Sequence, residues 1–159
     1  MSQRLAILIA IGFCAAGATQ AAGRGDQVFS MNGACSTLRV GARDLTRLCK
    51  GKLASFTLAN GRVGFTFLIG DEGLLQFSGD GSKQVSLPGQ RAIQPIDRVR
   101  LTIAKTGPEA VSTTTGSGRC TYGNPFAGTA KLSCRVAAGK GLFVAEFVTD
   151  GSPSDEGAL

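Results

Sequence analysis

Two cysteine pairs with equal spacing constrain this chain more than any other feature. Cys35 and Cys49 are 14 positions apart, and so are Cys120 and Cys134. The four cysteines that follow Cys14 permit three disulfide connectivities, and the equal spacing favours joining each of them to its nearer partner. A metal site is disfavoured, because the chain has no histidine and no CxxC motif. The spacing therefore predicts the disulfides Cys35–Cys49 and Cys120–Cys134, and no metal.

The N-terminal segment has the composition of a secretory signal peptide. Arg4 supplies a positive charge, and residues 5–16 form an unbroken run of small or apolar side chains that is too short for a permanent membrane span. The candidate cleavage positions follow Ala18, Ala21 and Ala22. We expect residues 1–22 to be removed together with Cys14, and the rest of the chain to be periplasmic or secreted, where disulfides persist.

The remaining sequence divides into three parts. Residues 23–33 are polar and glycine-rich, and we expect a flexible lead-in there. Residues 34–149 are expected to form a single β domain, because the 159-residue chain is 43% hydrophobic and has material for one core. The acidic, polar residues 150–159 are expected to form a disordered tail.

A hairpin over residues 52–69 is the strongest local pattern. Asn60-Gly61 separates two β-rich runs, which predicts a type I′ turn with positive φ at both residues. Alternation places one set of apolar side chains on the inner face of each strand. The expected inner set is Phe56 and Leu58 in the first strand, and Val63, Phe65, Phe67 and Ile69 in the second.

A second hairpin is predicted around the loop at residues 123–128. In the register centred on that loop, Cys120 faces Cys134, and Tyr122 faces Leu132 across antiparallel strands. A non-hydrogen-bonded cross-strand pair brings side chains close enough for a disulfide.

The pattern as a whole predicts an all-β fold of about eight or nine short strands. Successive hairpins imply an antiparallel meander, and both a small closed barrel and a twisted two-sheet sandwich fit it. For one segment the sequence allows two structures. Residues 42–50 carry Leu45, Leu48 and Cys49 at helical spacing, so they form either one short helix or a returning strand.

A basic outer face is the main candidate binding surface. The chain has a formal charge of +6, and the same alternation that buries apolar residues turns six cations outward. They are Lys52, Arg62, Arg98, Arg100, Lys131 and Arg135. Such a face suits an anionic envelope component or an acidic protein, whereas nucleic acid is disfavoured because no aromatic residues are interleaved with the cations. The alternative is a solvated exterior whose cations keep sheet edges from pairing.

Catalysis is disfavoured by the residues that are missing. Without histidine, the common nucleophilic triads are excluded, and disulfide-bonded cysteines cannot act as nucleophiles. A hydrolase would need a carboxylate pair. The candidates, most of them in glycine-containing turns, are Asp71, Glu72, Asp80, Asp97 and Glu146. We therefore expect a non-catalytic protein without a cofactor.

A carrier of small apolar ligands is the second functional hypothesis. Its ligand would lie among the phenylalanines Phe56, Phe65, Phe67, Phe77, Phe143 and Phe147. It requires an empty cavity of roughly 300 Å³ or more, whereas ordinary core packing would leave none.

Several short motifs give the chain a resemblance to a group of exported proteins. They are the leader, Cys35, the run from Cys49 to Lys52, the run from Asn60 to Phe65, the run from Arg119 to Tyr122, Cys134 and the run from Phe147 to Gly151. With this layout the chain resembles uncharacterised small exported proteins of Gram-negative bacteria. The resemblance covers most of the chain after the leader and implies export, but no activity or site residues.

Overall fold

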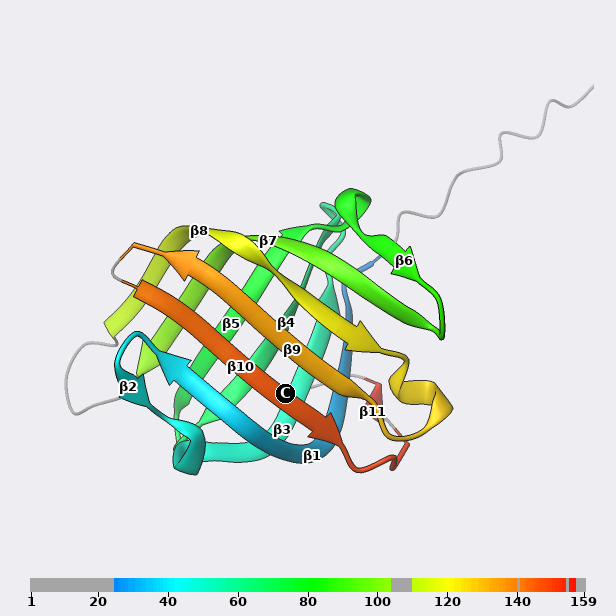
Figure 1. Cartoon of the computed structure of the whole chain (residues 1–159), viewed down its shortest axis with the longest axis horizontal. Coiled ribbons are helices and arrows are strands. Elements are labelled where there is room, and N and C mark those ends of the chain that lie inside the picture. Colours follow the sequence, from blue (N-terminus) through cyan, green and yellow to red (C-terminus); the bar gives the residue numbers. More distant parts are fainter. Residues whose placement is uncertain (1–24, 104–109, 140, 154, 157–159) are drawn as a thin grey trace, which may run out of the picture.

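The computed structural model describes residues 25–103, 110–139, 141–153 and 155–156. The expected signal peptide, residues 1–22, lies outside them. The described chain is an eight-stranded antiparallel β-barrel in which neighbouring strands follow one another around the wall, and β10 pairs with β1 to close it (Figure 1). The all-β meander is confirmed, and the barrel rather than the sandwich is formed.

The barrel strands are 8 to 14 residues long, and the remaining described elements are short strands and 3₁₀ turns. The barrel strands are β1 (Gln27–Val40), β3 (Cys49–Thr57), β4 (Arg62–Ile69), β5 (Gly73–Asp80), β7 (Arg91–Ile103), β8 (Ala110–Gly123), β9 (Lys131–Ala138) and β10 (Gly141–Thr149). The short strands are β2 (Arg43–Asp44), β6 (Val85–Leu87) and β11 (Asp155–Glu156). The 3₁₀ turns are η1 (Thr46–Leu48), η2 (Gly81–Lys83) and η3 (Pro125–Ala127).

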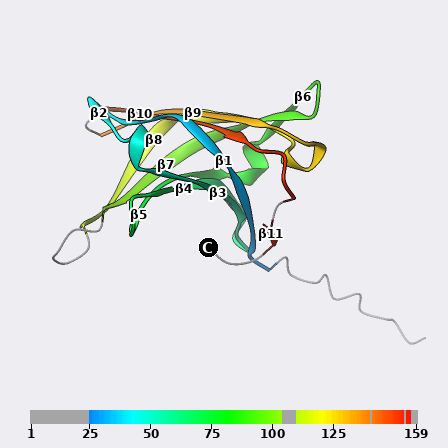
Figure 2. The same cartoon turned by 90° about the horizontal axis from the view of Figure 1, so that it is seen from below.

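Strand β1 turns a corner and closes the barrel. Residues 27–32 pair with β3, and residues 33–40 pair with β10, with a register shift between Cys35 and Thr37. Figure 2 shows the result, with β9 and β10 on one side of the barrel and β3, β4 and β5 on the other. A β-bulge of this kind increases bending and lets one strand serve both sides.

The two ends of the chain differ from expectation. The lead-in expected to be flexible over residues 23–33 is strand from Gln27 onward, because its main chain pairs with β3 despite the polar side chains. In the tail expected to be disordered, β11 pairs with Phe29 and Ser30 of β1. Main-chain hydrogen bonds depend little on side-chain polarity, so composition alone understated the order at both ends.

Three phenylalanine rings fill the middle of the barrel. Phe67, Phe77 and Phe147 are fully buried. The Phe67 ring meets the Phe77 ring edge-on at 5.9 Å and the Phe147 ring at 6.3 Å between centroids. Such packing leaves no space for a ligand at this level of the barrel.

Phe56 faces outward, contrary to the expected inner face. The register pairs Leu53 with Phe67 and Ser55 with Phe65, so Leu53 and Ser55 point inward, and Phe56 points outward. Its ring lies over Gly64 of β4, where a Cβ atom would come within 2.6 Å of the ring. The absence of a side chain at Gly64 therefore makes room for the outward ring.

The first hairpin has the expected strands but a different turn. The backbone has positive φ at Gly61 and not at Asn60, so the turn is not type I′. The Gly61 amide donates to the Leu58 carbonyl at 2.9 Å, and the Asn60 side chain accepts from the Arg62 amide at 3.0 Å. This is a three-residue loop ending in a left-handed glycine, which needs only one positive φ.

Residues 42–50, for which either a short helix or a returning strand was expected, form a short piece of each. They contain the two-residue strand β2 followed by the single turn η1. Thr46 explains the arrangement, because its hydroxyl accepts from the Leu38 amide at 2.9 Å while its own amide donates to Asp44 at 2.9 Å. These side-chain bonds compete with a longer helix.

Both predicted disulfides are present. Cys35 bonds to Cys49, and Cys120 bonds to Cys134. Cys120 and Cys134 lie directly opposite each other on β8 and β9, and Tyr122 lies opposite Leu132, as the hairpin register predicts.

Candidate anion-binding groove

The six predicted cations do not share one face. Arg62, Arg98 and Arg100 come together on the outer surface of β4, β5 and β7, where they line a groove of about 520 Å³. Lys52 is exposed on β3 but does not line this groove. Lys131 and Arg135 lie on β9, which β8, β7 and β5 separate from β4. We call the first site the arginine groove.

Register builds the arginine groove from two cross-strand rows. Because the strands are antiparallel and in fixed register, side chains on the same face line up across the sheet. The first row is Ala54, Thr66, Gln76, Arg100 and Thr113, and the second is Phe56, Gly64, Ser78, Arg98 and Thr115. Each row begins with an apolar residue on β3, passes an arginine on β7 and ends with a threonine on β8.

On β4 and β5 the floor of the groove carries neutral polar side chains, whereas Ala54, Phe56 and Leu58 make its β3 side apolar. Thr66 is 2% exposed, and its hydroxyl accepts from the Gln76 amide at 3.1 Å. Ser78 is 5% exposed and accepts from Arg62 at 3.0 Å. Buried hydroxyls are tolerated here because each has a hydrogen-bond partner.

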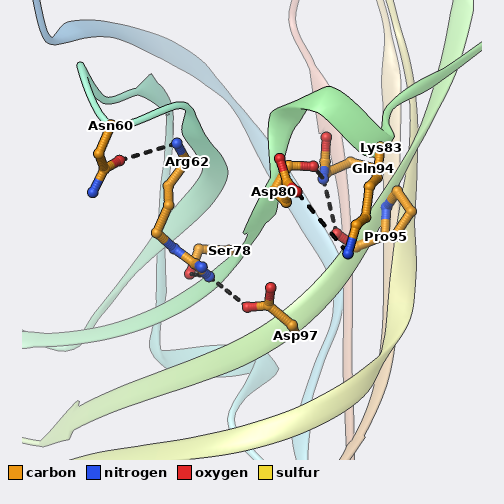
Figure 3. A network of polar contacts seen from close by, with 8 residues as sticks. All are labelled: Asn60, Arg62, Ser78, Asp80, Lys83, Gln94, Pro95 and Asp97. Atoms are coloured by element: carbon orange, nitrogen blue, oxygen red, sulfur yellow. Dashed lines mark hydrogen bonds and ion pairs between the residues drawn. The ribbon is translucent and has the colours of Figure 1, made fainter.

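Arg62 is anchored, and its charge is offset. Its guanidinium reaches across β5 to the Asp97 carboxylate at 2.5 Å while it also binds Ser78 (Figure 3). Asp97 lies at the register shift between Ile96 and Arg98. A β-bulge at such a shift changes the direction of the side chain that it carries. The Arg62–Asp97 pair therefore contributes little net charge to the groove.

Arg98 and Arg100 carry the free charge of the groove. Both side chains are exposed, and neither guanidinium forms an ion pair or a side-chain hydrogen bond with another described residue. They are two positions apart on one strand, so their Cα atoms are roughly 7 Å apart on the same face. Two guanidinium groups beside neutral hydroxyl and amide groups form a surface suited to carboxylate or phosphate.

A second polar cluster fixes the rim near η2. The Asp80 side chain accepts from the amide and the hydroxyl of Ser82, which lowers the pKa of its carboxyl. Gln94 is fully buried and donates to the carbonyls of Asp80 and Pro95 at 2.9 and 2.8 Å (Figure 3). Gln94 therefore ties β7 to the end of β5, a role that its sequence context did not indicate.

An apolar pocket opens at one end of the barrel. This barrel-end pocket has a volume of about 230 Å³ and is lined from inside by Met31, Leu53, Phe65 and Leu132. Phe29, Tyr122 and Phe126 stand around its opening. Its volume is below the roughly 300 Å³ that a carrier of drug-sized ligands needs.

Tyr122 gives a pH-dependent test of this pocket. Burial raises the pKa of the Tyr122 phenol above its ordinary value of 10.0. Because the folded state holds this proton more tightly, the associated stabilisation is complete below the unfolded-state pKa and is lost as pH rises through the folded-state pKa. We expect the phenolate absorbance of this single tyrosine to titrate above pH 10.0 in folded protein and near 10.0 in denaturant. An equal midpoint in both states would show that the ring is not desolvated.

The predicted carboxylates do not gather at either pocket. Asp71 pairs with Lys50 at 2.8 Å, which lowers the pKa of its carboxyl, and Glu146 lies 3.7 Å from Lys131. Neither pocket has a carboxylate among its described lining residues. No group of three potential metal ligands occurs in the described part of the chain.

Comparisons with protein-family models, curated proteins and solved structures give no match for this chain. Within the described ranges, no helix has the length and apolar character needed to cross a membrane.

Proposed function

We propose that this chain is an exported, non-catalytic β-barrel protein that binds an acidic glycan of the cell envelope through the arginine groove. Export is supported by the leader composition and by two disulfides, which persist in oxidising compartments. The single observation that carries the binding proposal is the exposed Arg98 and Arg100 pair in a groove whose lining also includes the neutral polar side chains of Thr66, Gln76 and Ser78.

The alternative explanation for the cations is weakened by the topology. Charged side chains on a sheet edge prevent pairing with other chains. Arg98 and Arg100 lie on β7, which is hydrogen-bonded to β5 on one side and β8 on the other over these residues. There is no edge for them to protect, so another role accounts for them better.

A glycan suits this groove because it needs both charge and neutral hydrogen bonds. Guanidinium groups bind carboxylate or phosphate in a bidentate manner. Gln76 and Thr113 lie next to Arg100 in the same row and offer amide and hydroxyl groups to sugar hydroxyls. An acidic polymer with regularly placed charges would contact both arginines at once.

The test compares two double variants with equal loss of charge. Arg98→Ala/Arg100→Ala is expected to weaken binding to polygalacturonate at least tenfold, because two charge-assisted contacts are lost. The control, Arg119→Ala/Arg135→Ala, removes a cross-strand pair of exposed arginines from β8 and β9 and is expected to change affinity less than twofold. Calorimetry at low and moderate salt measures both, and dextran serves as the uncharged polymer.

Two results would overturn this proposal. Equal weakening by both variants would mean that total charge alone attracts the polymer. Absence of binding to polygalacturonate by the unaltered protein at low salt would reject an acidic glycan. Binding to lipopolysaccharide instead, with the same variant dependence, would move the partner to a phosphorylated lipid and reject the glycan proposal.

A further inference from the structure

The barrel-end pocket is a blind cup rather than a channel. Its inner wall includes Leu53 and Phe65, and the fully buried rings of Phe67, Phe77 and Phe147 fill the barrel beyond them. A long acyl chain would need a path through those rings. The space therefore admits only a short, compact molecule.

Two pairs of aromatic rings line the cup. The rings of Phe29 and Phe126 meet at 5.6 Å and 87°, and the rings of Phe65 and Tyr122 meet at 4.9 Å and 66°. Aromatic rings favour edge-to-face and offset contacts, which add to the free energy of area burial. A planar ring bound in the cup would have these four rings among its lining residues and could make such contacts with them.

Polar side chains line the cup beside the aromatic rings, among them Tyr122, Gln84 and Lys131. The Tyr122 hydroxyl donates to the Gln84 side-chain oxygen at 2.7 Å, and both residues line the pocket. A phenol oxygen can also accept a hydrogen bond, and the Gln84 amide retains donors. The opening can thus bind one hydroxyl or carbonyl group of a ligand whose rings lie deeper.

Phe126 is placed to cover a bound molecule. It lies on η3 at the rim and is 66% exposed, whereas its neighbour Phe29 is half-buried. A ligand in the cup would remove part of the Phe126 ring from water. Burial of apolar surface of this kind favours binding.

We infer that the barrel-end pocket binds a small aromatic molecule of one or two fused rings that carries a single hydrogen-bonding group. The volume of the pocket agrees with a ligand of this size. An apolar cavity of about 150 Å³ is known to hold one benzene ring, and this pocket measures about 230 Å³. The inference is independent of the arginine groove, which lies on the outer surface; among the described lining residues the two sites share Phe56, and the groove's arginines do not line the pocket.

The test uses 2-naphthol and the single tyrosine. Tyr122 is the only tyrosine, and the chain has no tryptophan, so tyrosine fluorescence reports this pocket alone. We expect saturable quenching and a stoichiometry of one by calorimetry. Ser55→Phe should weaken binding at least tenfold, because Ser55 lines the pocket and the added ring would occupy it. Ser133→Phe, on β9 between two inward-facing buried residues, is the matched control and should bind normally.

A second variant keeps the test decisive if Ser55→Phe does not fold. Phe126→Ala removes an exposed ring and should weaken 2-naphthol binding about fivefold without affecting folding. Arg98→Ala/Arg100→Ala should bind 2-naphthol like the unaltered protein, which separates this result from that of the groove. No saturable binding at millimolar ligand, or equal affinity in Ser133→Phe, Phe126→Ala and the unaltered protein, would overturn the inference.

Discussion

Phe67→Ala is expected to lower the free energy of unfolding by about 3–5 kcal/mol, among the largest effects of any single substitution in this chain. Phe67 is fully buried and lies opposite Leu53 on β3 and Leu75 on β5. Its ring also contacts Phe77 and Phe147, which come from strands on different sides of the barrel. Truncation removes the ring that joins these contacts and leaves a cavity that the surrounding strands cannot readily close.

Denaturant unfolding of matched variants measures this effect. The control is Phe126→Ala, which removes the same side chain at a position 66% exposed and should cost less than about 1 kcal/mol. Since domains of this size are stable by about 5–15 kcal/mol, Phe67→Leu provides an intermediate variant if Phe67→Ala is too unstable to measure. Similar losses for Phe67→Ala and Phe126→Ala would contradict a tightly packed barrel centre.

Local sequence pattern predicted the strands because side-chain alternation and turn residues act over short distances. The second strand of the first hairpin spans residues 62–69 as expected, and the register that places Cys120 opposite Cys134 follows from symmetry about one loop. The strand over residues 27–33 was missed, because its pairing partners on β3 and β11 supply order that its own composition does not reveal.

The candidate sites depended on register that the sequence did not contain. Alternation correctly turned Arg62, Arg98 and Arg100 outward, but it does not say which outward residues share a side of a closed barrel. Strand order places Lys131 and Arg135 elsewhere, and the two-row floor of the groove emerges only from the pairing of β4, β5 and β7. Phe56 was predicted to point inward because it alternates with Leu58 on the more apolar face of its strand. The pairing of Leu53 with Phe67 shows that the face with Leu53 and Ser55 points inward instead.

Removal of either disulfide is expected to cost about 3 kcal/mol, because each closes a loop of similar length in the unfolded chain. The sequence separation is 14 for both bonds, so the entropic part of the loss should be equal. Cys120 and Cys134 are fully buried, whereas Cys35 and Cys49 are half-buried. Replacing Cys120 and Cys134 by alanine should therefore cost more, since core packing is lost as well.

The two bonds should also differ in where the chain loosens. Cys120–Cys134 joins strands that remain paired on both sides of the bond, from Gly116 to Tyr122 on β8. Cys35–Cys49 joins β1 to the start of β3 beyond the last pair of their ladder, Asn32 with Lys52. Hydrogen exchange of the Cys35→Ala/Cys49→Ala variant should thus speed up mainly over residues 43–51, where fewer main-chain bonds hold the segment. Faster exchange spread evenly over the barrel would show instead that this corner unfolds only with the whole domain.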